Sequence, residues 1–210
     1  MERIPQFERT NFEREKDFNF LGEQIKTYVF VEPEAAEYLP KITKQDLANK
    51  KERYRILMGE YGIDESDENK VFIFIKSILE AEPDKEPGYY QEGKEEVIVN
   101  LPRIKDLVRK IQERNPEFRQ QNLVGEIHTH PVAYGDPTLS VKQRPWHPSK
   151  EDFDPIENSY RDKILTPDKP FIFGIAGLNK NSKTRYGFYK AVKRGAAYTC
   201  SEVFSQMLEN

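Results

Sequence analysis

The feature that most constrains the fold is an apolar run that ends in two histidines. Residues 122–127 read Asn-Leu-Val-Gly-Glu-Ile, and His128-Thr129-His130-Pro131 follows directly. A short apolar run of this kind is typical of a buried strand. In a strand, residues i and i+2 point to the same face, so His128 and His130 are expected to project together from its carboxyl end. The sequence therefore predicts two side chains placed to hold one metal ion.

Six further segments rich in β-branched and aromatic residues are predicted to be strands. They lie at residues 26–31, 53–59, 71–75, 97–99, 170–176 and 184–189. The second and third are expected to form an antiparallel hairpin around a polar turn at residues 62–69. Because strands and helices are mixed without strict alternation, the predicted fold class is α+β, or a three-layer α/β arrangement, around one mixed β-sheet flanked by helices.

Helices are predicted between these strands and after the histidines. Pro33 opens the first helix, and Pro40 interrupts it. Thr43 is then a candidate N-cap for a second, polar helix that reaches Lys51. Further predicted helices cover residues 102–114, a segment that starts at Ser149 and, weakly, the tail at 199–209.

Composition and charge exclude several classes of function. The chain has 210 residues, enough for one large domain, and its formal net charge of −3 with no long basic block argues against nucleic-acid binding. Its single cysteine, Cys200, rules out an intrachain disulfide and a thiolate zinc cluster. No apolar run approaches the roughly 20 residues of a membrane helix, and the charged N-terminus does not resemble a signal peptide. The expected setting is cytoplasmic, away from membranes.

Three stretches are expected to lie outside the regular core. Residues 1–24 form a charge-rich N-terminal arm with four phenylalanines, which docks on the domain, binds a partner or is a frayed tail. Residues 82–96 are rich in Pro, Gly and Glu and are predicted to form a surface loop. Residues 131–148 contain four prolines and form a long loop beside the histidines, and such loops are often functional. The domain itself is expected to span residues 25–210.

The histidine pair calls for a third ligand and a base. A catalytic zinc site typically takes three protein ligands and leaves one position for water. Asp152 is the candidate third ligand, from the first turn of the helix that starts at Ser149. Ser149 and Asp152 also form the pattern of a capping box, so both interpretations stand. The water needs a separate carboxylate as general base. The candidates are Glu52, Glu60, Glu80, Glu126 and Glu151, of which Glu126 would share a face with both histidines.

Taken together, these residues resemble the JAMM (MPN/JAB) metalloprotease motif: an upstream glutamate, then His-Ser/Thr-His-Pro, then Ser-x-x-Asp. Glu52 begins a segment, residues 52–59, that is similar to the glutamate-bearing segment of this family, although Arg55 stands where many relatives have glycine. The resemblance implies one MPN-like domain with a cytidine-deaminase-like fold, and it makes residues 131–148 an inserted loop. It implies a zinc ion held by His128, His130 and Asp152. It further implies that Glu52 is the general base and that Ser149 donates a hydrogen bond to the oxyanion.

The same resemblance suggests a substrate class. Members of this family cut peptide or isopeptide bonds that follow the C-terminal tail of ubiquitin or of a ubiquitin-like protein, and some bacterial members accompany enzymes similar to ubiquitin-activating and ubiquitin-conjugating enzymes. The expected function is therefore a zinc-dependent isopeptidase or peptidase that removes such a protein from a conjugate or a precursor. The alternative is an inactive MPN-like scaffold that binds a partner protein. A zinc nucleoside deaminase is excluded, because it requires a Pro-Cys-x-x-Cys pair that a chain with one cysteine lacks.

Overall fold

A computed structural model describes most of the chain. It covers residues 19–49, 53–64, 66–80, 101–130, 145–179, 181 and 183–209 with their side chains, and residues 90–92 and 97–99 as backbone. Glu52, residues 1–18 and residues 131–144 lie outside the described part. So do residues 81–89 and 93–96, most of the predicted loop at 82–96.

One mixed sheet dominates the structure, as the sequence predicts, and it has eight strands. Its strand order is β10-β1-β3-β2-β6-β7-β8-β9, and a separate pair is formed by β4 and β5. The bounds are β1 (Lys26–Val31), β2 (Tyr54–Asp64), β3 (Asp67–Glu80), β4 (Tyr90–Glu92), β5 (Val97–Val99), β6 (Asn122–Thr129), β7 (Ile172–Leu178), β8 (Thr184–Arg194), β9 (Ala197–Glu202) and β10 (Phe204–Met207). β1 runs parallel to β3 and β10, β6 runs parallel to β7, and the other neighbours are antiparallel.

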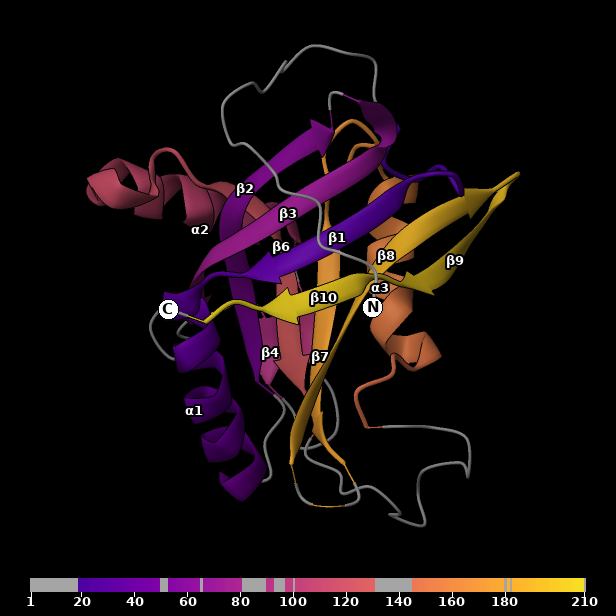
Figure 1. The fold of residues 1–210 in the computed structure, drawn as a ribbon. Helices are drawn as coiled ribbons and strands as arrows, with labels where there is room; N and C mark the ends of the chain where they lie inside the picture. The colour runs from indigo at the N-terminus through magenta and orange to yellow at the C-terminus, as the bar shows by residue number, and fades with distance from the viewer. Residues whose placement is uncertain are drawn as a thin grey trace.

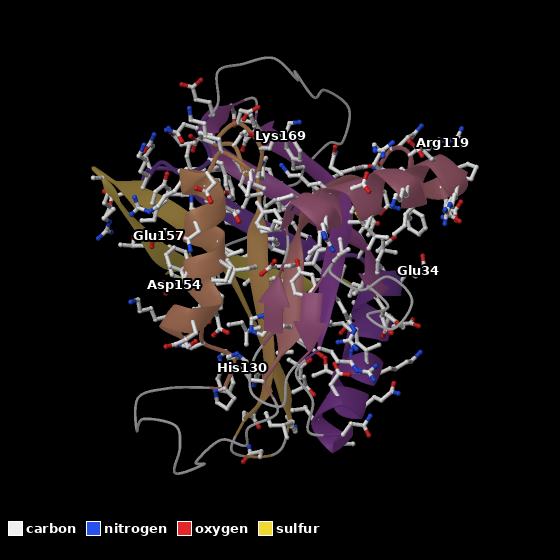
Figure 2. All side chains as sticks on the ribbon, turned by 180° about the vertical axis from the view of Figure 1, so that it is seen from behind. Glu34, Arg119, His130, Asp154, Glu157 and Lys169 are labelled. Atoms are coloured by element: carbon white, nitrogen blue, oxygen red, sulfur yellow. The ribbon has the colours of Figure 1, made fainter. Side chains whose placement is uncertain are left out.

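Helices cover the two faces of this sheet, which curls strongly (Figure 1). The helix α1 (Pro33–Asn49) packs Ala35, Leu39 and Ile42 into one core cluster. The other cluster is completed by α2 (Leu101–Arg114) and α3 (Lys150–Arg161), which the reverse view in Figure 2 brings toward the viewer. The class is therefore mixed α+β. No helix within the described ranges has the length and apolar character needed to cross a bilayer.

The first helix differs from its prediction, because Pro40 does not interrupt it. α1 runs without a break from Pro33 to Asn49, with Pro40 inside. Proline removes one intrahelical hydrogen bond, but burial of Leu39 and Ile42 on either side of it holds the helix against the sheet. Thr43 is consequently an interior residue and not an N-cap: its hydroxyl donates to the Leu39 carbonyl at 2.8 Å.

The predicted turn at residues 62–69 is also too long. β2 continues to Asp64 and β3 begins at Asp67, so the chain reverses within a few residues. The carboxylate of Asp64 accepts hydrogen bonds from the backbone N–H and the hydroxyl of Ser66, which stabilises this tight reversal. The antiparallel β2–β3 hairpin itself is confirmed.

The secondary-structure prediction is most wrong for the tail at 199–209, which forms parts of β9 and β10 and not a weak helix. Gly195, with a φ of 61°, allows the turn that pairs β9 with β8. β10 then pairs in parallel with β1, at the opposite edge of the sheet order. These pairings join residues far apart in the chain, and they override a local helical preference that was weak from the start.

The segment before β1 is anchored in the core. Phe20 is fully buried, and the buried ammonium of Lys190 on β8 donates to the carbonyls of Phe20 and Ile25 at 3.1 and 2.8 Å. Phe20 therefore docks on the domain, as one of the three interpretations of the arm expected. Its other three phenylalanines precede residue 19 and are outside the described residues.

Candidate metal centre

The two histidines lie at the carboxyl end of β6, in the middle of the sheet. β6 is held on both sides, because His128 faces Tyr54 across the ladder to β2 and Ile175 across the ladder to β7. The N–H of His130 donates to the Ala176 carbonyl at 2.8 Å, so the chain stays fixed beyond the last strand residue. Figure 2 shows His130 at one end of the molecule, near the start of α3.

Gly125 explains how β6 can approach β7 so closely. A Cβ atom at this position would lie 2.2 Å from the Ile172 carbonyl oxygen. Only glycine fits that contact without moving the backbone. The close approach fixes the position of β6, the strand that carries the histidines.

A capping box orients the carboxylate of Asp152, the third predicted ligand. The Ser149 Oγ accepts from the Asp152 N–H at 3.2 Å, and the Ser149 N–H donates to Asp152 Oδ2 at 2.6 Å. The box therefore uses one carboxylate oxygen and leaves Oδ1 for the histidines. Both interpretations of Ser149 and Asp152 describe the same geometry, since the cap is what orients the carboxylate.

The structure brings the three predicted ligands together. His128 Nε2 lies 3.1 Å from His130 Nε2 and 3.1 Å from Asp152 Oδ1, and His130 Nε2 lies 3.4 Å from Asp152 Oδ1. Ligand atoms on a tetrahedral zinc ion, at distances near 2.0–2.1 Å from it, lie roughly 3.3–3.4 Å from one another. Among the described residues, these three form the one group of His, Cys, Asp and Glu side chains that could hold a metal ion. Their donor atoms and their spacing fit zinc.

The protonation states also suit a cation. Burial lowers the pKa of His128, against the opposing effect of the Asp152 carboxylate, so the imidazole tends to be neutral. Burial alone would raise the pKa of Asp152, but its hydrogen bonds to His128 and His130 hold that pKa well below its usual range. A neutral imidazole and an ionised carboxylate are the forms in which these groups bind metals.

Glu126, one of the five candidate bases, lies under this cluster. It is 4% exposed, and the Tyr54 hydroxyl donates to its Oε2 at 2.6 Å. Burial raises the pKa of Glu126 to about 7, and the Asp152 charge acts in the same direction. Tyr54 was missed as a site residue, because its position opposite His128 is set by the pairing of β2 with β6 in the folded sheet.

The other four candidate bases differ in whether they are paired, exposed or outside the described residues. Glu60 pairs with Lys76 on the neighbouring strand, and Glu80 pairs with Arg55. Glu151 is an exposed residue of the first turn of α3. Glu52 is outside the described residues, and it directly precedes Arg53, whose carbonyl accepts from the Thr129 N–H at 3.3 Å.

The end of the long loop packs against β7 and β8. The Tyr189 hydroxyl donates to the Trp146 carbonyl at 2.8 Å, and the His147 ring meets the Tyr189 ring edge-on. Gly177 and Gly187 leave room for this packing, because a Cβ on either would lie within 3 Å of Pro145 or Trp146. His147 is therefore part of the packed loop end and is not in the ligand group.

Comparisons with known proteins leave the family open. No family model matches the chain, and no curated protein matches it. Among solved structures, protein DSY2949 from Desulfitobacterium hafniense shares 17% identity at a TM-score of 0.48, over 87% of this chain and 94% of that one. A protein from Salinibacter ruber shares 12% identity at a TM-score of 0.36, over 87% of this chain and 92% of that one.

Proposed function

We propose that this protein is a zinc-dependent peptidase or isopeptidase of the JAMM type, which removes a ubiquitin-like protein from a conjugate or a precursor. One observation carries the proposal: Nε2 of His128, Nε2 of His130 and Oδ1 of Asp152 converge to 3.1–3.4 Å from two separate elements. The sequence motif requires this convergence, although Asp152 lies at least 22 residues from either histidine along the chain.

The finer description of the fold belongs to the same proposal. We assign the chain an MPN-like, cytidine-deaminase-like architecture. This assignment is supported by the parallel pairing of β6 with β7, the antiparallel β2–β3 hairpin upstream and the helices on both faces of the sheet. The ligands lie where β6 ends and α3 begins, which matches the order of the motif along the chain.

The proposed chemistry divides the work among five side chains. When bound by His128, His130 and Asp152, zinc acts as a Lewis acid that lowers the pKa of a coordinated water and polarises a carbonyl. Glu52 takes a proton from the attacking water and delivers it to the leaving amine. The Ser149 hydroxyl accepts from the Asp152 N–H, so its own hydrogen is free to be donated to the developing oxyanion.

The substrate class follows from the resemblance, and so do the partners. The chain would act on the extended C-terminal tail of a ubiquitin-like protein, alongside activating-like and conjugating-like enzymes of the same pathway. The inserted loop at 131–148 directly precedes Ser149, and its described end packs on Tyr189 of β8 through Trp146 and His147. This loop is our candidate for substrate selection.

The test is cleavage of a panel of ubiquitin-like C-terminal fusions and isopeptide conjugates, with zinc content measured on the same samples. We expect wild-type protein to bind one zinc ion and to lose cleavage on chelation. His128→Ala should lose both zinc and cleavage, whereas Glu52→Gln should keep zinc and lose cleavage. Ser149→Ala should lower kcat about 10²- to 10³-fold, the usual effect of one oxyanion donor. Glu151→Gln is the matched control, a carboxylate next to Asp152 that should retain activity.

Each other outcome has a defined meaning. Normal turnover by Glu52→Gln would remove Glu52 as the base, and loss of activity in Glu126→Gln would then identify Glu126. Zinc binding without cleavage of any fusion or conjugate would favour the partner-binding scaffold. A wild-type protein that binds no zinc would overturn the proposal.

A further inference from the structure

A buried carboxylate lies directly behind the histidine pair, on the opposite face of β6. Thr129, between the two histidines, points away from them, and its hydroxyl donates to Asp46 Oδ2 at 3.0 Å. Asp46 comes from α1 and is fully buried. The sequence analysis placed Asp46 in a polar helix and gave it no role at the site.

Asp46 is held in place by a strong ion pair. Arg55 on β2, 2% exposed, donates to both Asp46 oxygens at 2.5 and 3.0 Å, a two-pronged geometry that fixes the plane of the carboxylate. Arg55 also donates to Glu80, which accepts in addition from the Tyr38 hydroxyl at 3.2 Å. Arg55 is the residue at which the chain departs from the family pattern, and the structure gives it a specific partner.

The same carboxylate also reaches the start of β2. Arg53 Nε lies 3.7 Å from Asp46 Oδ1, and the Arg53 carbonyl accepts from the Thr129 N–H. Asp46 therefore touches the two segments that the proposed site requires: the residue between the metal ligands, and the residue that follows Glu52. Burying such a pair seldom improves stability over apolar packing, so its position calls for another explanation.

We propose that Asp46 is a positioning residue, which fixes the histidine pair through the Thr129 hydroxyl and fixes the start of β2 through Arg53. It touches neither metal nor substrate. Groups that hold metal ligands in their orientation set the affinity for the metal, and Asp46 would do so through Thr129, the residue between the two histidines. The inference rests on the metal centre of the proposed function, and it is independent of the substrate.

The test compares Thr129→Val with Thr129→Ser. Valine keeps the shape and removes the hydroxyl, whereas serine keeps the hydroxyl. We expect Thr129→Val to bind zinc about 10- to 100-fold more weakly, in competition with a chromophoric chelator, and to change the visible absorption spectrum of the Co²⁺-loaded protein. Thr129→Ser should restore most of the lost affinity and the wild-type spectrum.

Two further variants separate positioning from stability. Thr43→Val removes another buried hydroxyl of the Asp46 region, one that bonds to the Leu39 carbonyl, and should lower stability while leaving zinc affinity unchanged. Asp46→Asn should show the affinity loss of Thr129→Val or a larger one, if it folds. In the metal-free protein, the imidazole ¹⁵N resonances of His128 and His130 should shift in Thr129→Val and stay unchanged in Thr43→Val.

The outcomes distinguish this inference from the proposed function. Wild-type zinc affinity, Co²⁺ spectrum and imidazole resonances in Thr129→Val would overturn the positioning role and leave the metal centre intact. Equal losses of affinity in Thr43→Val and Thr129→Val would also overturn it, because the effect would then be general. Absence of zinc binding in the wild-type protein would overturn both.

Discussion

The two faces of β6 at its carboxyl end both bury charge, but among the described residues only the α1 face contains its own cation, Arg55. On the α1 face, Asp46 is bonded by Arg55 through both oxygens. On the α3 face, Asp152 bonds to two imidazoles and to the backbone of its own capping box. No lysine or arginine from the described ranges hydrogen-bonds to Asp152, and Glu126 beneath it bonds to a tyrosine.

This difference has a simple electrostatic meaning. A buried carboxylate is tolerated when it is paired and hydrogen-bonded. Asp46 meets this condition through Arg55, so the α1 face needs no further cation, and we call it the closed face. Among the described residues, Asp152 meets it with two imidazoles that share one small space, so a divalent cation would complete the α3 face, which we call the open face. Strand alternation makes both arrangements possible one residue apart, since Thr129 and its two histidine neighbours point to opposite sides.

The largest expected effect is a loss of stability when the Asp46–Arg55 ion pair of the closed face is removed. Asp46→Asn should lower the free energy of unfolding by about 3–5 kcal/mol, because it leaves Arg55 buried without its main counter-charge. Asp152→Asn in metal-free protein should cost only about 1 kcal/mol, since an amide oxygen still accepts from the Ser149 N–H. Urea denaturation of both variants under chelation measures the difference, and equal costs would mean that the two faces do not differ as described.

A smaller effect on stability is expected when zinc binds at the open face. Zinc at about 100 times its Kd should stabilise the wild-type protein by about 2.7 kcal/mol, if it binds the folded state alone. Thermal unfolding with and without zinc measures this gain as a rise in Tm. His130→Ala and Asp152→Asn should lose the rise. A rise that persisted in both variants would place the bound metal elsewhere.

Much of the open face could be predicted from the sequence because its signals are local. The histidines are two residues apart on a strand, and Ser149 and Asp152 are three apart at a helix start, so periodicity and capping rules give both orientations. Meeting of the two pairs was expected because a zinc site needs a third protein ligand, and the family resemblance named the same residue, Asp152. The extent of β1, residues 26–31, was likewise predicted correctly from its β-branched and aromatic composition.

The closed face could not be predicted because its partners meet only in the folded chain. Asp46 and Arg55 are nine residues apart, yet they come from a helix and a strand on different layers. Residues 40 and 43 were misread for the same reason, since burial of α1 against the sheet outweighs the local effect of proline. The tail was misread because the partner of β10 is β1, at the other end of the chain.

The smallest expected effect concerns the second carboxylate beside Arg55 on the α1 face. Arg55 contacts Glu80 as well as Asp46, but Glu80 is 40% exposed and its two bonds from Arg55 are long, at 3.4 and 3.3 Å. A partly solvated pair of this kind contributes about 0–1 kcal/mol, so Glu80→Gln should cost at most that amount in urea denaturation and should leave zinc affinity unchanged. A cost comparable to that of Asp46→Asn would show that Arg55 depends on both acids equally. The closed face would then extend to the surface of β3, and its rigidity would depend on salt concentration. A small cost keeps the closure inside the core, where the hydrogen bond from Thr129 to Asp46 joins α1 to the strand that carries the histidines.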